Sequence, residues 1–167
     1  TVDANGAFDA TSGFVTFTDA GNLNLFSTVT DLGTLSDNFG TVTYDGVDQT
    51  VFSDIYYSLT AGGGSGIKTH GGDVTVAGDF TVDTLVPTAM EGNNLTVTHE
   101  TDIIGTITNS TATLDANGAF DATGGINTFT DAGNPRLDST VTDLGTLSDN
   151  FGTVTYDGVD QVVFSDC

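Results

Sequence analysis

Basic residues are almost missing from this chain. Its 167 residues contain two lysines or arginines against 23 aspartates and glutamates, which gives a formal net charge of −21 at pH 7. Such a surface repels nucleic-acid phosphates and anionic lipid headgroups, so we expect neither nucleic acid nor membrane insertion. Divalent cations, which screen and bridge carboxylates, are the expected counterions.

Cysteine, tryptophan and long apolar runs are also scarce or absent. A single cysteine excludes a disulfide framework, and no apolar run reaches the length of a transmembrane helix. Threonine, glycine, aspartate and valine dominate instead. Because β-branched residues favour strands, and glycine, asparagine and aspartate favour tight turns, the composition predicts an all-β fold without long helices.

An internal repeat organises the sequence. Residues 1–54 and 113–166 align at an offset of 112 positions and are identical at 46 of 54 positions. This divides the chain into one full repeat unit, residues 1–112, and the first half of a second unit, residues 113–167, within one continuous solenoid. Because the chain begins and ends inside the pattern, we expect it to be a window from a longer array.

The spacing of the strands predicts a solenoid. Segments that read approximately VTxT begin near residues 15, 42, 74, 95, 127 and 154. Their mean spacing of about 28 residues predicts a parallel β-helix of roughly six turns. The alternative is a pair of Ig-like β-sandwich domains, in which TVTY-DG-VDQTVF would form an antiparallel hairpin around Asp45-Gly46.

Differences between the two copies predict which residues are exposed. Residue 26 is Phe in the first copy and Asp at the equivalent position 138, and Leu23 is replaced by Pro135. Neither change suits a packed central strand, so residues 22–27 and 134–139 are expected to form a loop.

The same comparison predicts the orientation of several strand residues. Val15 is replaced by Asn127, which predicts an outward side chain, whereas the apolar pair Phe14 and Ile126 is expected to face inward. Aromatic residues that do not vary are core candidates: Phe8/Phe120, Phe39/Phe151, Tyr44/Tyr156 and Phe52/Phe164.

Two segments resemble a known kind of repeat. Residues 56–82 read YYSLTAGGGSGIKTHGGDVTVAGDFTV, and residues 40–51 read GTVTYDGVDQTV. They resemble Thr/Gly-rich β-helical repeats of large secreted, adhesin-like surface proteins of Bacteroidota, where the pattern is approximately YxNLTxxGxGTKTLxGDxTVxGxLTV, preceded by GTVTFxGxxQxI. This chain departs from the pattern at Ser58 and His70. The resemblance covers residues 40–82 and 152–166, and it implies an exported, filament-forming or adhesin-like β-helix.

No motif indicates catalysis. The chain contains no GxSxG, HExxH or CxxC sequence. Its only basic residues, Lys68 and Arg136, lie in no recognisable acidic cluster. We therefore expect no enzymatic activity.

Calcium is the ion that the sequence suggests. The motif DANGAFD places oxygen ligands at alternate positions around a glycine, although it lacks the loop of an EF-hand. The simpler interpretation is a turn in which these side chains bond the local backbone. The candidate ligands are Asp3, Asn5, Asp9, Asp115, Asn117 and Asp121.

The two histidines are 29 positions apart, close to the predicted turn length. This spacing would let His70 and His99 share a metal on adjacent turns. The simpler interpretation is that both are solvated turn residues.

These observations favour a structural repeat segment of an extracellular surface filament, fibre or sheath, whose partner is another copy of itself, head to tail. The alternative is a spacer in a giant cell-surface adhesin that binds its target elsewhere. A third class is a repeat lectin that contacts surface glycans through Tyr56 and Tyr57, although this aromatic pair is expected in the core.

Overall fold

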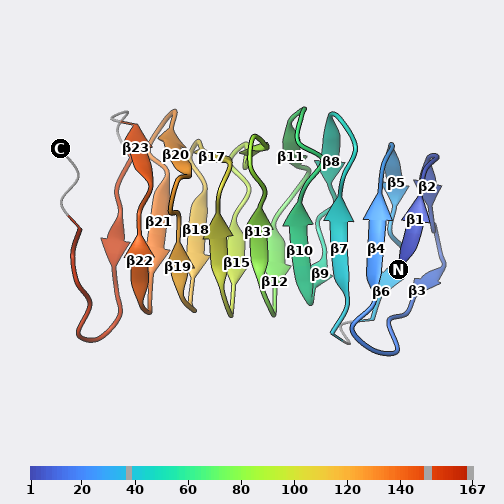
Figure 1. Cartoon of the computed structure of the whole chain (residues 1–167), viewed down its shortest axis with the longest axis horizontal. Helices are drawn as coiled ribbons and strands as arrows, with labels where there is room; N and C mark the ends of the chain where they lie inside the picture. The colour runs from blue at the N-terminus through green and yellow to red at the C-terminus, as the bar shows by residue number, and fades with distance from the viewer. Residues whose placement is uncertain (37–38, 149–151, 165–167) are drawn as a thin grey trace.

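The structure is a computed structural model that describes residues 1–36, 39–148 and 152–164. Regular structure within these residues consists only of short β-strands of two to four residues. Successive strands stack along one long axis, and the N-terminal and C-terminal ends lie at opposite ends of the stack (Figure 1). Every strand pair is parallel.

The chain winds as a parallel β-solenoid with three faces. Each turn contributes one strand to each face, so that every third strand pairs with the next of its kind. Face one is the eight-stranded sheet of β1 (Val2–Ala4), β4 (Asn22–Leu25), β7 (Thr41–Tyr44), β10 (Ser58–Ala61), β13 (Phe80–Val82), β16 (Thr101–Ile103), β19 (Phe120–Asp121) and β22 (Val141–Asp143).

The other two faces are six-stranded sheets, each preceded by a separate strand pair. Face two contains β8 (Gln49–Val51), β11 (Lys68–His70), β14 (Pro87–Ala89), β17 (Thr106–Asn109), β20 (Ile126–Phe129) and β23 (Thr146–Ser148), after the pair β2 (Phe8–Asp9) and β5 (Val29–Asp31). Face three contains β9 (Ile55–Tyr56), β12 (Val74–Val76), β15 (Leu95–Val97), β18 (Thr113–Ala116), β21 (Asn134–Leu137) and β24 (Thr155–Tyr156), after β3 (Phe14–Val15) and β6 (Thr34–Leu35).

The predicted parallel β-helix is confirmed, but its turns are shorter and more numerous than predicted. On face one, Val2 in the first strand and Val141 in the eighth strand are separated by seven turns, which is about 20 residues per turn. The stack therefore has about eight turns rather than six. The 28-residue interval was misleading because it joined strands of different faces: β3 and β12 belong to face three, whereas β7 belongs to face one.

The Ig-like alternative is wrong. Asp45-Gly46 is a corner between β7 on face one and β8 on face two, not a hairpin turn. The two strands pair instead with strands of neighbouring turns.

The core has an apolar side and a polar side. Alternate residues of each strand point inward, and leucine, valine, isoleucine and phenylalanine side chains of faces one and three stack on one another from turn to turn. Seven of the residues that the structure describes are polar and buried, and six of them lie on the inner side of face two: Gln49, Lys68, His70, Thr88, Asn109 and Asn127. Burial of these groups requires partners, and the corner backbone supplies several of them.

The loop predicted at residues 22–27 and 134–139 is not observed, because β4 and β21 occupy most of it. Leu23 and Leu25 are buried, and the Phe-to-Asp exchange occurs just after the strands, at the exposed Phe26 and half-buried Asp138. Pro135 is tolerated within β21 because Asn134 and Asp138 make the backbone bonds to the preceding turn, and pairing to β24 begins only at Arg136.

The predicted orientations at the next strand are also reversed. Phe14 is 80% exposed and Ile126 is 42% exposed, whereas Asn127 points inward and is buried. An inward asparagine is accepted because its Nδ2 donates to the carbonyl of Leu144, 2.8 Å away, on the following turn.

Of the aromatic core candidates, Tyr44 and Phe120 are fully buried, while Phe8, Phe52 and Tyr156 are partly buried. Phe39 is exposed and contacts the ring of Tyr57, Phe164 is also exposed, and Phe151 lies outside the described residues.

Tyr44 and Tyr56 form a closed polar network inside the solenoid. Their hydroxyls are 3.0 Å apart, the amide of Phe52 donates to Tyr44, and Tyr56 donates to the carbonyl of Phe52. Tyr56 is therefore a core residue, as expected, and is not available to bind a glycan.

The 112-residue repeat is not a whole number of turns. In the first copy, β1 pairs with β4 and Asp3 lies opposite Asn24. The equivalent strands of the second copy, β18 and β21, pair in the same register, with Asp115 opposite Arg136. However, the first pair lies on face one and the second on face three. The pair β2–β5 recurs as β19–β22, including its register shift, and β3–β6 recurs as β20–β23. Because β18 follows β1 by 17 strands, the repeat advances the chain by five and two-thirds turns.

Local packing is preserved despite this rotation. The ring of Phe17 lies against Gly40, where an added Cβ would be 2.1 Å from it, and the ring of Phe129 lies against Gly152 in the same way. The repeat therefore encodes local structure rather than a fixed face.

A buried glutamine joins successive turns at the corner between β7 and β8. The Oε1 atom of Gln49 accepts from Gly46, and its Nε2 atom donates to the carbonyls of Leu25 and Ser27 on the preceding turn, at 2.7–2.8 Å. Gln161 makes the equivalent contacts in the second copy, where it is more exposed.

We predict that Gln49→Leu lowers the free energy of unfolding by about 2–4 kcal/mol, because it leaves three backbone groups at a buried corner without partners. Gln161→Leu is the matched control and should have less effect, since water reaches that corner. Urea denaturation of both variants measures the difference. Equal losses of unfolding free energy in the two variants would show that burial of the corner does not determine how much the glutamine contributes to stability.

Candidate functional site

Three features of the surface and interior are candidates for a functional site. They are a hollow at the C-terminal end, the polar row inside face two, and acidic residues on the outside of face one. Within the described residues, no group of three or more His, Cys, Asp or Glu side chains is arranged to hold a metal.

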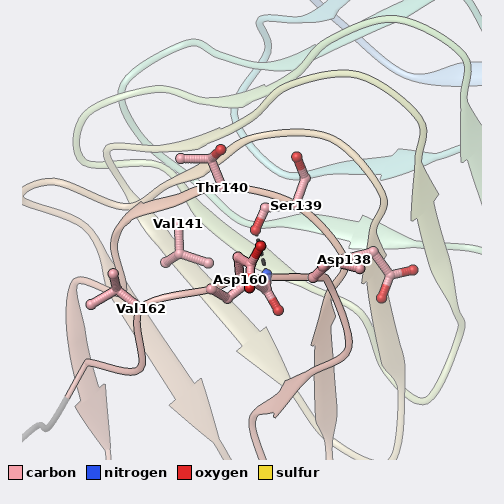
Figure 2. Close-up of a pocket in the computed structure, with 8 residues that line it drawn as sticks. Asp138, Ser139, Thr140, Val141, Asp160 and Val162 are labelled. Carbon is pink, nitrogen blue, oxygen red and sulfur yellow. Dashed lines mark hydrogen bonds between the residues drawn. The ribbon is translucent and has the colours of Figure 1, made fainter.

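The hollow at the C-terminal end has a volume of about 390 Å³ and lies between residues 138–141 and residues 159–162. Figure 2 shows the backbone of these two segments around it, with Asp138, Asp160, Val141 and Val162 on its walls. Nε2 of Gln161 on one wall donates a hydrogen bond to the carbonyl of Ser139 on the other. Among the described residues, the walls carry no histidine, cysteine or basic side chain.

The first copy shows how the equivalent corner is filled. Lys68 is fully buried on the next turn, and its Nζ donates to the carbonyls of Gly46 and Val47 at 2.6 and 2.8 Å. Gly158 and Val159 are the equivalent residues in the second copy. The hollow is therefore an uncovered solenoid corner rather than a site shaped for a substrate.

Lys68 was not predicted as a core residue. In the sequence, Ile67 is the apolar residue of the pair and suggests an inward position, yet it is exposed. Burial lowers the pKa of Lys68, and the nearby carboxylates of Asp45 and Asp48 oppose this effect. No pattern in the sequence distinguishes a lysine that reaches corner carbonyls from a solvated one.

The histidines do not share a site. His70 is buried on the inner side of face two, with both ring nitrogens lacking a partner, so the expectation that it is a solvated turn residue is wrong. His99 is exposed, and its Nδ1 contacts the carboxylate of Asp79, which raises the pKa of the imidazole. Burial lowers the pKa of His70 to about 4.

Within each motif, the two candidate calcium-binding aspartates lie on different faces. Asp3 is on β1 and Asp9 on β2, while Asp115 is on β18 and Asp121 on β19. The corner residues Asn5 and Asn117 lie between these strands, and Nδ2 of Asn117 donates to the carbonyl of Val97.

Each of the aspartates already has a protein partner. Asp9 and Asp121 each accept from the amide and the hydroxyl of the threonine two residues later, as in the simpler, turn-forming interpretation. Asp3 accepts from Nδ2 of Asn24, and Asp115 from Arg136.

Like charges meet on the outside of face one. Asp102 on β16 is in register with Asp121 on β19. Burial raises the pKa of Asp102, and Asp121, Glu100 and Asp83 raise it further. The sequence did not single out Asp102, because only the register of the turns brings it beside Asp121. A cation bound between these two carboxylates would relieve their repulsion.

No protein-family model, curated protein or solved structure matches this chain. The class is therefore defined by the fold alone, as a three-faced parallel β-solenoid built from a 112-residue repeat. The described part of the chain contains no helix that is long and apolar enough to cross a membrane.

We predict that His70 makes the fold sensitive to acid. In the unfolded chain His70 binds a proton near pH 6.5, whereas in the folded chain it does so only near pH 4. The stability that the folded state owes to a neutral His70 is therefore fully present above pH 6.5 and is lost as the pH falls toward 4. The loss amounts to about 3 kcal/mol. Urea denaturation from pH 7 to pH 4 should show that His70→Leu loses less stability than the original chain.

His99→Gln is the control for this experiment, because its ring is exposed. It should leave the acid-induced loss due to His70 in place. If His70→Leu and the original chain lose stability in parallel between pH 7 and pH 4, His70 is not the group responsible.

We predict that millimolar Ca²⁺ raises the melting temperature more than monovalent salt at the same ionic strength, because a divalent ion bridges neighbouring carboxylates. Asp121→Asn should reduce this difference, whereas Asp131→Asn, the same charge change at an exposed corner, should not. Thermal melts of the three chains measure the effect. Equal shifts from both salts would mean screening alone.

Proposed function

We propose that this chain is a structural repeat segment of an extracellular surface filament, fibre or sheath. The alternative is a spacer in a giant cell-surface adhesin whose binding site lies elsewhere. In both roles the repeat supplies length and stiffness, and its partner is another copy of the repeat, stacked head to tail.

The observation that carries this proposal is the uninterrupted stacking of near-identical repeats. The backbone ladder of face one runs through all eight turns and crosses from residues 1–112 into residues 113–143 without a break. A solenoid of this kind has only nearest-neighbour contacts between turns, so adding repeats extends it without altering its cross-section.

A structural rather than enzymatic role agrees with the distribution of polar groups. Lys68 is buried against backbone carbonyls, and Arg136 contacts Asp115 and Asp157 on adjacent turns. Both basic residues thus hold turns together and present no free cation to a substrate.

The acidic exterior supports an extracellular setting with divalent cations, and the resemblance of residues 40–82 to adhesin-like repeats points the same way. The net charge of −21 would keep neighbouring filaments apart unless such cations bridge them.

Electron microscopy and mass measurement of the native particle test the proposal. We expect long filaments of uniform width that have a mass per length of about one 20-residue turn per 4.8 Å. A giant single polypeptide with a distinct tip would support the spacer. A compact particle with an enzymatic activity would contradict both roles.

A further inference from the structure

The N-terminal end of the solenoid is an open apolar surface. Among the described strands, β1 pairs only with β4, and Val2 is 62% exposed. A hollow of about 350 Å³ is lined there by Val2, Phe8, Val15 and Phe17. We call the surface of these four side chains the first-turn surface.

The second repeat contains the same surface in a covered state. Leu114, Phe120, Asn127 and Phe129 are the equivalents of the four residues, and all are buried, with Leu114 completely inaccessible. Two of the four residues, Phe8 and Phe17, recur unchanged as Phe120 and Phe129, yet they are only partly buried in the first copy and are buried in the second. The difference in burial at these positions therefore comes from what lies against the turn.

Residues 93–112 cover that turn in the second repeat. β15 pairs with β18, placing Leu95 opposite Leu114, and β16 pairs with β19, placing Thr101 opposite Phe120. β17 pairs with β20, placing Asn109 opposite Phe129. Three amides complete the junction: Asn117 donates to Val97, Ile126 to Gly105 and Thr130 to Asn109.

We propose that the first-turn surface is a docking surface for a turn with the sequence of residues 93–112, supplied by a preceding repeat. Strand β1 then pairs with a β15-like strand, β2 with a β16-like strand and β3 with a β17-like strand, in the registers that the second repeat shows. This inference rests on the proposed structural role and specifies how one repeat meets the next.

The junction determines the symmetry of the array. Each repeat continues the solenoid after five and two-thirds turns, which corresponds to a rise of about 27 Å at the usual strand spacing. Any corner loop of the repeat, such as that after β7, therefore faces three directions in successive repeats. A partner that recognises such a loop would meet it on every side of the array.

The experiment adds residues 56–112 of this chain directly before Thr1, so that Ala112 joins Thr1 as it joins Thr113. Hydrogen exchange is measured at the amides of Asn5, Phe14 and Thr18, the equivalents of Asn117, Ile126 and Thr130. We expect their exchange to slow at least tenfold. A matched control carries Leu95→Asp and Val97→Asp in the added segment only, and should leave these amides exchanging as in the original chain.

Two results would overturn the proposal. One is unchanged exchange at the three amides, whether or not the added segment is itself protected, since the same segment folds against the equivalent turn in the original chain. The other is slower hydrogen exchange of these amides in the original chain as its concentration rises. That result would mean that the end of a second molecule, rather than a preceding repeat, binds the first-turn surface. Neither result depends on whether native filaments are seen, so the inference and the proposed function can fail separately.

Discussion

The parallel backbone ladder between successive turns is the constraint on which this structure depends. Each strand has only two to four residues, and a ladder that short is stable only when the turns on both sides keep the same register. Corner contacts enforce that register. Gln49 reaches back to the carbonyls of the preceding turn, and Lys68 reaches back to the corner that Gln49 holds. These two polar residues inside face two are therefore part of the ladder rather than defects in the core.

The charge distribution follows from the same ladder. Stacking at about 4.8 Å places equivalent outward residues of adjacent turns side by side, so an acidic sequence necessarily brings carboxylates together. Asp102 and Asp121 show the unfavourable result, with a raised pKa at Asp102. Arg136, between Asp115 and Asp157, shows how one basic residue relieves it over three turns. The first copy has Asn24 at this position, which bonds Asp3 without adding charge.

The rotation of the repeat separates two levels of organisation. The sequence of residues 1–54 specifies strands, corners and the contacts between neighbouring turns, and these recur in the second copy down to the ring of Phe129 against Gly152. Which face a strand occupies is not a property of that sequence, since β1 and β18 lie on different faces. An array built in this way is uniform along its axis, but it does not present one constant side to its surroundings.

The sequence alone predicted the fold class, the repeat and the short parallel strands, because β-branched alternation, turn residues and self-similarity are local signals. It did not determine the turn length, because strands of three faces look alike. It also misplaced Phe14, Asn127 and His70, whose orientations depend on neighbouring turns: Asn127 is buried because the carbonyl of Leu144 lies above it. The candidate ligands Asp3, Asn5 and Asp9 were recognisable as a motif. The winding of the chain places Asp3 and Asp9 on different faces, with Asn5 at the corner between them, and brings Asp102 beside Asp121. Contacts between turns join residues that are about 20 positions apart in the sequence. This separation is set by the geometry of the corners rather than by any local sequence pattern.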